Sequence, residues 1–153
     1  MNLTTKEVAI EKIKKYETQL LGCKYVFIDN KSKITNIIFT GSGQKYYMMI
    51  SWFNDNLDYN YLYLNPINCN YTNIDIYKQI ILNCNSNHYN MIGISYGGYA
   101  AMVYSSMFPT QSLIIYNYFY KVIKNDEYIV ISFLHLVYFQ NGLHLMNNEL
   151  YKR

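Results

Sequence analysis

Ser95 is the residue of this chain whose surroundings best suit chemistry. It lies where a short apolar segment of strand length, residues 91–94, changes to a small-residue segment that suits a helix, residues 97–107. A serine at such a strand-to-helix corner presents its hydroxyl above the end of the strand. The backbone N–H of Tyr96 and the first turn of the helix then face any oxyanion that forms there.

Three glycines surround the serine where a tight corner needs them. Side chains two residues before or after the serine would collide with neighbouring backbone, so Gly93 and Gly97 permit the turn and Gly98 adds room. The run Gly93-Ile94-Ser95-Tyr96-Gly97 matches G-x-S-x-G and resembles the nucleophile elbow of the α/β-hydrolase family. The resemblance covers residues 34–117 and implies a serine nucleophile.

A second glycine-rich loop, Gly41-Ser42-Gly43, follows the apolar run of residues 34–40, as at the carboxyl end of a buried central strand. In α/β-hydrolases the loop after the third strand supplies a second oxyanion donor, and many members carry His-Gly there. The resemblance therefore places the oxyanion hole at the N–H groups of Tyr96 and Ser42, with Gly41 permitting the turn. Thr40 stands where histidine is commoner. An ordinary connecting loop is the alternative.

A serine hydroxyl needs a base that accepts its proton and a third group that orients the base. The family's chain order is serine, acid, histidine, so the resemblance implies Asp126 as the acid and His144 as the base. A surface or packing role for His144 is the alternative, as is a solvated turn for Asp126, which precedes the last strand-like run. His135 alternates with apolar residues and is interpreted as a core histidine.

The order of patterns predicts a single α/β domain over residues 1–153. We expect a mostly parallel sheet with helices on both faces, preceded by an N-terminal helix over residues 4–21 and a hairpin of residues 24–29 and 34–40. Further strands are expected over residues 61–64, 112–117 and 128–139, helices over residues 44–53 and 74–83, a charged connection at 121–127 and a helical tail over residues 143–153.

Composition limits the partners. The chain has 153 residues with 51% apolar and 15% charged side chains, which suits one globular domain. Its lysines are scattered and Arg153 is the single arginine, which argues against nucleic-acid binding. The longest apolar run, residues 128–139, is shorter than the roughly 20 residues that a membrane span needs.

The termini and cysteines bear on compartment and cofactors. The N-terminus has no apolar signal core, so we expect a cytoplasmic protein. Cys23, Cys69 and Cys84 follow neither a disulfide nor a metal-ligand spacing. We therefore expect no metal and no other cofactor.

These patterns predict a serine-dependent acyl-transfer enzyme, an esterase, another hydrolase or an O-acyltransferase, that acts on a small ester through an acyl-Ser95 intermediate. Only residues 108–153 follow the elbow helix, where the family carries its acid, histidine and often a lid. A compact enzyme, a truncated product and a domain completed by a partner all fit this length. The alternative function is a non-catalytic binding module, and an uncovered sheet edge would favour a homodimer. A nucleotide-binding protein is disfavoured because neither glycine cluster fits G-x-G-x-x-G or a P-loop.

Overall fold

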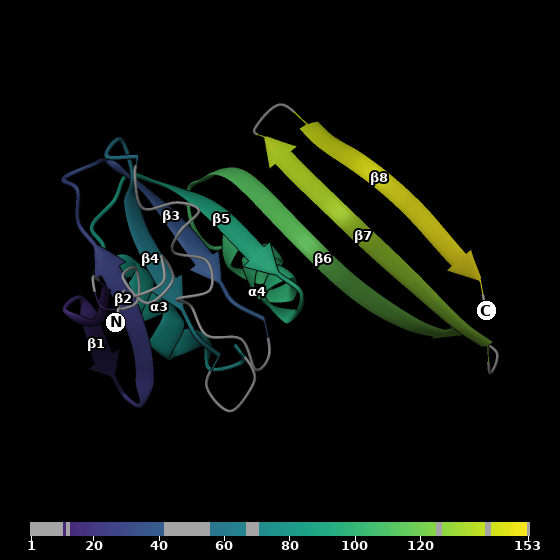
Figure 1. The fold of residues 1–153 in the computed structure, drawn as a ribbon, viewed down its shortest axis with the longest axis horizontal. Coiled ribbons are helices and arrows are strands. Elements are labelled where there is room, and N and C mark those ends of the chain that lie inside the picture. The colour runs from purple at the N-terminus through teal and green to yellow at the C-terminus, as the bar shows by residue number, and fades with distance from the viewer. Residues whose placement is uncertain are drawn as a thin grey trace, which may run out of the picture.

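The structure is a computed structural model that describes residues 11, 13–41, 56–66, 71–124, 127–139 and 142–152 (Figure 1). For residues 117–152 the description is limited to the strands and their pairing. The elements are β1 (Glu17–Leu20), β2 (Cys23–Ile28), β3 (Ile34–Phe39), β4 (Asn60–Leu64), α3 (Ile74–Leu82), β5 (His88–Ile94), α4 (Tyr96–Ser105), β6 (Thr110–Lys124), β7 (Glu127–Phe139) and β8 (Gly142–Lys152).

The strands form one sheet in the order β1-β2-β4-β3-β5-β6-β7-β8. Of the seven described strand pairs, β3–β4, β3–β5 and β5–β6 are parallel and the other four are antiparallel. The prediction of a mostly parallel sheet is therefore wrong. Parallel neighbours need a crossover connection, which α4 provides between β5 and β6, while α3 carries the chain from β4 past β3 to β5. Short connections join the antiparallel pairs β1–β2, β6–β7 and β7–β8.

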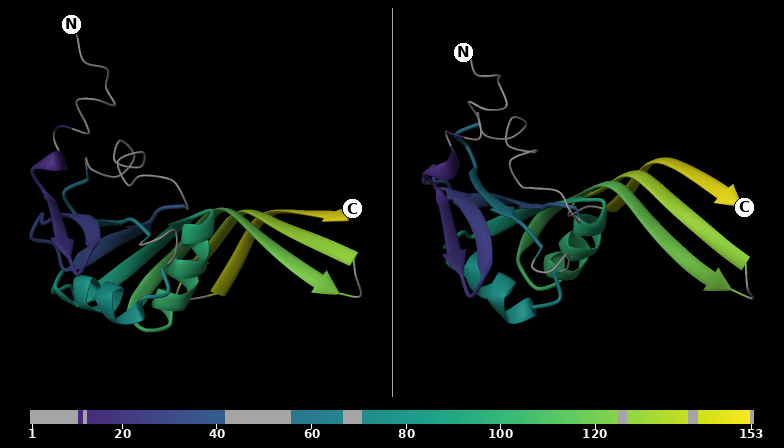
Figure 2. Two further views of the ribbon diagram at one scale, coloured as in Figure 1. Left: turned by 90° about the horizontal axis from the view of Figure 1, so that it is seen from below. Right: turned by 60° about the horizontal axis from the view of Figure 1, so that its bottom comes forward.

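Both α3 and α4 cover the same face of the sheet (Figure 2). The helix α3 presents apolar residues at helical spacing, and α4 presents small ones that allow close packing. The opposite face has its own apolar cluster, which includes Ile13, Ile38 and Ile92. The prediction of helices on both faces is therefore wrong for α3 and α4, the two helices that the structure describes from end to end.

The predicted N-terminal helix is wrong in its last turn. Residues 11, 13 and 14 are helical, but residues 17–20 form β1, which pairs with β2. Leu21 and Gly22 join the two strands, with φ of 47° and 86°. Positive φ at both central residues is what a two-residue type I′ hairpin turn requires. Gly22, the residue after the predicted helix, is thus part of a hairpin turn.

The predicted hairpin of residues 24–29 and 34–40 is also wrong, although both strands exist. The strand β4 lies between them, antiparallel to β2 and parallel to β3. The loop of residues 29–33 therefore passes over the end of β4 instead of making a tight turn.

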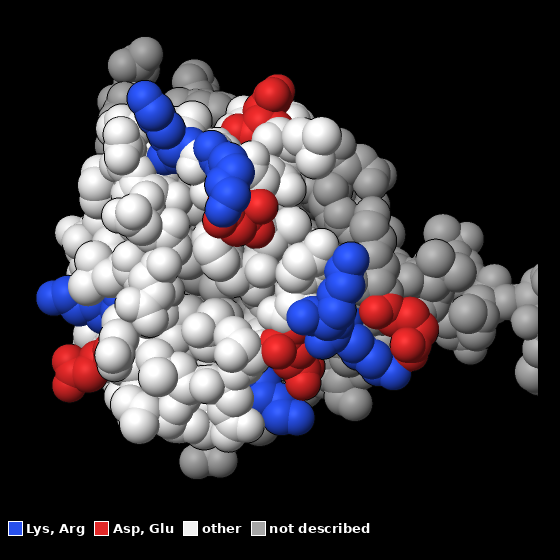
Figure 3. Space-filling model, turned by 90° about the vertical axis from the view of Figure 1, so that its left-hand side faces the viewer, with Lys and Arg blue, Asp and Glu red and all other residues white. Residues whose placement is uncertain are grey.

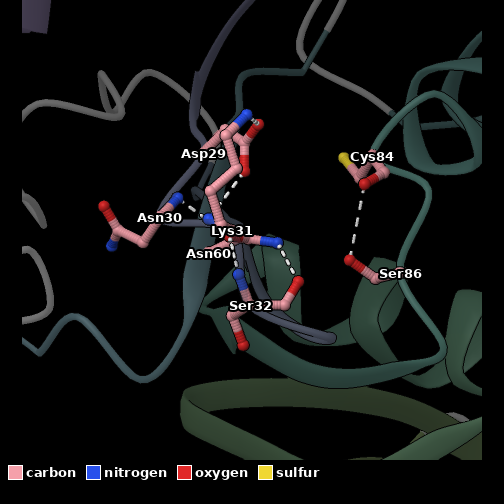
Figure 4. A network of polar contacts seen from close by, with 7 residues as sticks. All are labelled: Asp29, Asn30, Lys31, Ser32, Asn60, Cys84 and Ser86. Carbon is pink, nitrogen blue, oxygen red and sulfur yellow. Dashed lines mark hydrogen bonds and ion pairs between the residues drawn. The ribbon is translucent and has the colours of Figure 1, made fainter.

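Asn60, the first residue of β4, fixes this loop (Figure 4). Its side-chain oxygen accepts hydrogen bonds from the backbone N–H groups of Asn30, at 2.9 Å, and Ser32, at 3.0 Å. Its side-chain nitrogen donates to the carbonyl of Ser32 at 2.8 Å. Asn60 is buried, so these three bonds satisfy polar groups that water reaches poorly.

The C-terminal third differs most from the prediction. The expected charged connection at residues 121–127 lies largely in strands, since β6 extends through Lys124 and pairs there with Glu127. The expected helical tail is strand β8, paired along β7. Its alternation of Leu143 and Leu145 with polar residues fits a strand period once β7 offers a partner.

Charged side chains lie interspersed on the face at the β1 edge of the sheet (Figure 3). Two ion pairs join neighbours in the fold, Lys24 with Glu17 at 3.6 Å and Lys31 with Asp29 at 2.6 Å. That face therefore has no large area of one sign. Among the described residues, no helix is long and apolar enough to cross a membrane, and no group of potential ligands is arranged to hold a metal ion.

The role of Asn60 can be tested by substitution. Asn60→Ala leaves the two N–H groups and the Ser32 carbonyl without their partners, so we expect a loss of about 1–3 kcal/mol in the free energy of unfolding. Asn83→Ala, at an exposed position after α3, is the control and should change it by less than about 0.5 kcal/mol. Urea unfolding measures both. Equal effects of the two substitutions would contradict this role.

Two buried thiols provide a test of the core. Burial raises the pKa of Cys23 from 9.0 to about 11 and the pKa of Cys84 to about 12. The folded state thus favours the neutral thiol, so the associated stability is complete below pH 9 and is lost as the pH rises toward 11–12. We expect slow maleimide labelling of both residues at pH 8 and rapid labelling in urea, measured by peptide mass spectrometry. Rapid labelling of the folded protein would contradict their burial.

Candidate active site

Ser95 lies at the corner between β5 and α4, as the sequence predicts. Its backbone has φ 51° and ψ −120°, a conformation that side-chain-bearing residues rarely adopt. Its N–H donates to the carbonyl of Tyr116 at 2.8 Å, which extends the β5–β6 pairing to the corner itself. The corner is thus a strained turn held by the sheet.

The Ser95 side chain is half-buried and does not cap the helix it precedes. A serine at the N-cap ordinarily accepts a hydrogen bond from the first helical turn. Here the turn is closed by backbone instead, since the N–H of Gly98 donates to the Ser95 carbonyl at 2.9 Å. The hydroxyl is therefore not engaged as a helix cap.

Close backbone approaches explain Gly93 and Gly97. A Cβ built on Gly93 would lie 2.5 Å from both the Gly97 carbonyl oxygen and the Gly98 Cα. A Cβ on Gly97 would lie 2.1 Å from the Phe39 carbonyl oxygen and 2.7 Å from that of Thr40. The elbow helix thus packs directly on the end of β3. Gly98 is buried within α4, and because it has no side chain the helix can approach its neighbours closely there.

The same approach brings Thr40, the residue after β3, close to the corner. Thr40 is fully buried, and its N–H donates to the Leu64 carbonyl at 3.2 Å. Gly41 is buried beside it, and Ser42, the expected second oxyanion donor, lies outside the described residues. The start of the predicted oxyanion loop is therefore next to the helix N-terminus that carries Tyr96.

Aromatic rings continue from this point to the surface. Tyr71, which is buried, stacks on Tyr96 with ring centroids 6.4 Å apart and planes at 19°. Tyr96 in turn stacks on Tyr99, which is 47% exposed, at 6.3 Å. Tyr71 also contacts the Phe39 ring edge-on at 5.4 Å. These residues are uncharged, so an oxyanion beside them would depend on amide dipoles and the helix N-terminus.

The structure does not bring His144 to Ser95. His144 lies in β8, not in a loop before a helix, and its backbone pairs with Val137, which pairs with Ile114 beside Ile92 of β5. Three strand spacings, roughly 14 Å, therefore separate it from β5. A base needs hydrogen-bond contact with the hydroxyl. Its catalytic role remains a prediction.

His135 lies nearer to the corner. Its backbone pairs with Tyr116, which pairs with Ile94, the residue before Ser95. It is therefore two strand spacings, roughly 10 Å, from β5. Asp126, the expected acid, lies outside the described residues.

Sequence reasoning missed the contribution of Tyr71. Its hydroxyl lies 2.9 Å from the Thr40 carbonyl and 3.0 Å from the Leu64 carbonyl, at the ends of two strands. Tyr71 lies in the connection between β4 and α3, where no periodic pattern in the sequence would distinguish it from other tyrosines. The parallel pairing of β3 with β4 was the missing information.

Comparison with models of protein families, with curated proteins and with solved structures finds no match for this chain.

The strain at Ser95 can be measured by paired substitutions. Glycine adopts φ 51°, ψ −120° without steric cost, so Ser95→Gly should be more stable than Ser95→Ala by about 1–3 kcal/mol. At Ser105, in the last turn of α4, the order should reverse, since alanine exceeds glycine in a helix by about 1 kcal/mol. Urea unfolding of the four variants measures both differences. A Ser95→Ala variant at least as stable as Ser95→Gly would show that Ser95 is unstrained.

Proposed function

We propose that this protein is a serine-dependent acyl-transfer enzyme, most simply an esterase, that uses Ser95 as its nucleophile. The observation that carries the proposal is the strained φ and ψ of a half-buried serine whose hydroxyl does not cap its helix. Strain of this kind is kept where the surrounding structure imposes it, often at functional sites. The resemblance to the α/β-hydrolase elbow concerns this corner and the loop after β3, and not the sheet as a whole.

The proposed reaction has two steps. The Ser95 hydroxyl oxygen attacks the ester carbonyl carbon while its proton passes to a histidine base. The C–O bond to the alcohol then breaks, the base returns the proton to the departing oxygen, and acyl-Ser95 remains. Water repeats the sequence and releases the carboxylic acid. An acceptor alcohol in place of water gives acyl transfer.

The oxyanion would be bound by backbone N–H groups. Tyr96 is the first residue of α4, and the first N–H groups of a helix have no partner within the helix. The proposed second donor is the N–H of Ser42, two residues after Thr40. The Thr40 carbonyl approaches Gly97 of α4. Loss of one such donor typically raises the barrier by about 2.7–4 kcal/mol.

A non-catalytic binding module is the second candidate. It is favoured by one observation: in the described part of the chain, the backbones of His135 and His144 lie two and three strands from β5. A serine without a base would remain a weak nucleophile.

A fluorophosphonate probe distinguishes the two candidates. We expect a covalent adduct on Ser95 in the purified protein, detected by peptide mass spectrometry, because the probe reacts with activated serines. Ser95→Ala should abolish the adduct, and Ser106→Ala, an exposed serine after the same helix, should not change it. A wild-type protein without an adduct would exclude the enzyme and leave the binding module.

The same probe identifies the base. His135→Gln and His144→Gln each remove one candidate imidazole, and the variant that labels at least about 100-fold more slowly marks the proton acceptor. Unchanged labelling in both would assign the role to neither histidine.

A further inference from the structure

Tyr71 links the end of β3 to the elbow. Its hydroxyl has one proton, which lies within hydrogen-bond distance of the carbonyl oxygens of Thr40 and Leu64, at 2.9 and 3.0 Å. These carbonyls terminate β3 and β4. The Thr40 hydroxyl completes the group by donating to the Leu64 carbonyl at 3.1 Å or to the Asn65 side chain at 3.2 Å.

Tyr71 is itself held in place by the elbow helix. The hydroxyl of Tyr104, in α4, donates to the Tyr71 backbone carbonyl at 3.0 Å. The Tyr71 ring then stacks on Tyr96, the residue whose N–H is one proposed oxyanion donor. One side chain therefore contacts the elbow through its ring and the loop after β3 through its hydroxyl.

The Thr40 carbonyl sets the direction in which the chain leaves β3. A peptide unit is planar, so fixing this oxygen fixes the whole Thr40–Gly41 peptide. The chain passes through Gly41 directly to Ser42, the proposed second donor. Glycine allows a wide range of φ and ψ, so fixing the peptide before Gly41 limits the conformations open to Gly41 itself.

Burial keeps the phenol in its donor form. It raises the pKa of Tyr71 well above the ordinary value, so the hydroxyl is protonated across the working range of pH. Two buried carbonyls without this donor would lose a hydrogen bond that water replaces poorly.

We propose that Tyr71 is a positioning residue for the proposed oxyanion hole, because it holds the Thr40–Gly41 peptide, which precedes Ser42 in the chain, beside the N-terminus of α4. The inference rests on the proposed function. It requires no contact between Tyr71 and the substrate. Removal of the Tyr71 hydroxyl therefore lowers the rate of the chemical step and leaves binding of the substrate in its ground state almost unchanged.

The test is Tyr71→Phe, which keeps the ring and removes the hydroxyl. With para-nitrophenyl acetate we expect kcat to fall about 10- to 100-fold and KM to change less than about twofold, together with slower fluorophosphonate labelling of Ser95. Tyr89→Phe is the matched control, because Tyr89 is a buried tyrosine near the other end of β5, with its hydroxyl 3.5 Å from the Ile81 carbonyl. It should keep kcat within about twofold of wild type.

Thermal unfolding shows whether a variant is still folded, and so separates a loss of positioning from a loss of the folded state. If Tyr71→Phe fails to fold, Tyr104→Phe, which releases the Tyr71 backbone, replaces it and should lower kcat in the same direction by a smaller factor. Equal kcat in wild type and in the folded Tyr71 or Tyr104 variant overturns the inference while the enzyme proposal remains. A wild-type protein that neither hydrolyses the ester nor labels at Ser95 overturns both.

Discussion

The contact between the first turn of α4 and the carboxyl end of β3 is the constraint on which the rest of the structure depends. A Cβ on Gly97 would lie 2.1 Å from the Phe39 carbonyl oxygen, so the helix N-terminus approaches this strand more closely than any side chain permits. The approach forces the chain to turn sharply at Ser95, and the turn places this serine in a conformation that serine rarely adopts. It also brings Thr40, the residue after β3, beside the helix. The backbone strain at Ser95 and the position of Thr40 next to α4 thus have one cause.

Buried polar groups at the strand ends determine how this constraint is supported. At the carboxyl ends of β3 and β4, the Tyr71 hydroxyl lies within hydrogen-bond distance of two carbonyls. Near the amino end of β4, the Asn60 side chain forms hydrogen bonds with three backbone groups of the β2–β3 loop. Backbone that leaves a sheet loses its ladder partners, so buried polar side chains at each end supply hydrogen bonds in their place. These two residues hold both ends of the parallel centre of the sheet.

The local elements could be predicted from the sequence because each depends on neighbouring residues. The spacing of Ile74, Tyr77 and Ile81 predicted α3, and the change of period at Ser95 predicted β5 and α4, all of which the structure confirms. The pairing of strands was not predictable in the same way. The insertion of β4 between β2 and β3 is accompanied by hydrogen bonds between Asn60 and a loop 28 to 30 residues earlier, a contact without any local pattern. The flanking β1, β6 and β8 depend likewise on the strands beside them.

The sequence by itself predicted the corner, because a serine flanked by glycines at a change of period is a local pattern. The reason for Gly97 is tertiary, since its neighbours across the contact are the carbonyls of Phe39 and Thr40. The sequence also determined the apolar strands and helices of the centre, because their periods of two and 3.6 are set by local geometry. Only the tertiary structure decided that both complete helices share one face, that the sheet is mixed, and that His144 lies in a strand three places from β5. The physical reason is that hydrogen bonds between strands satisfy the backbone equally well in several orders. The choice among these orders is made by contacts between residues far apart in the chain.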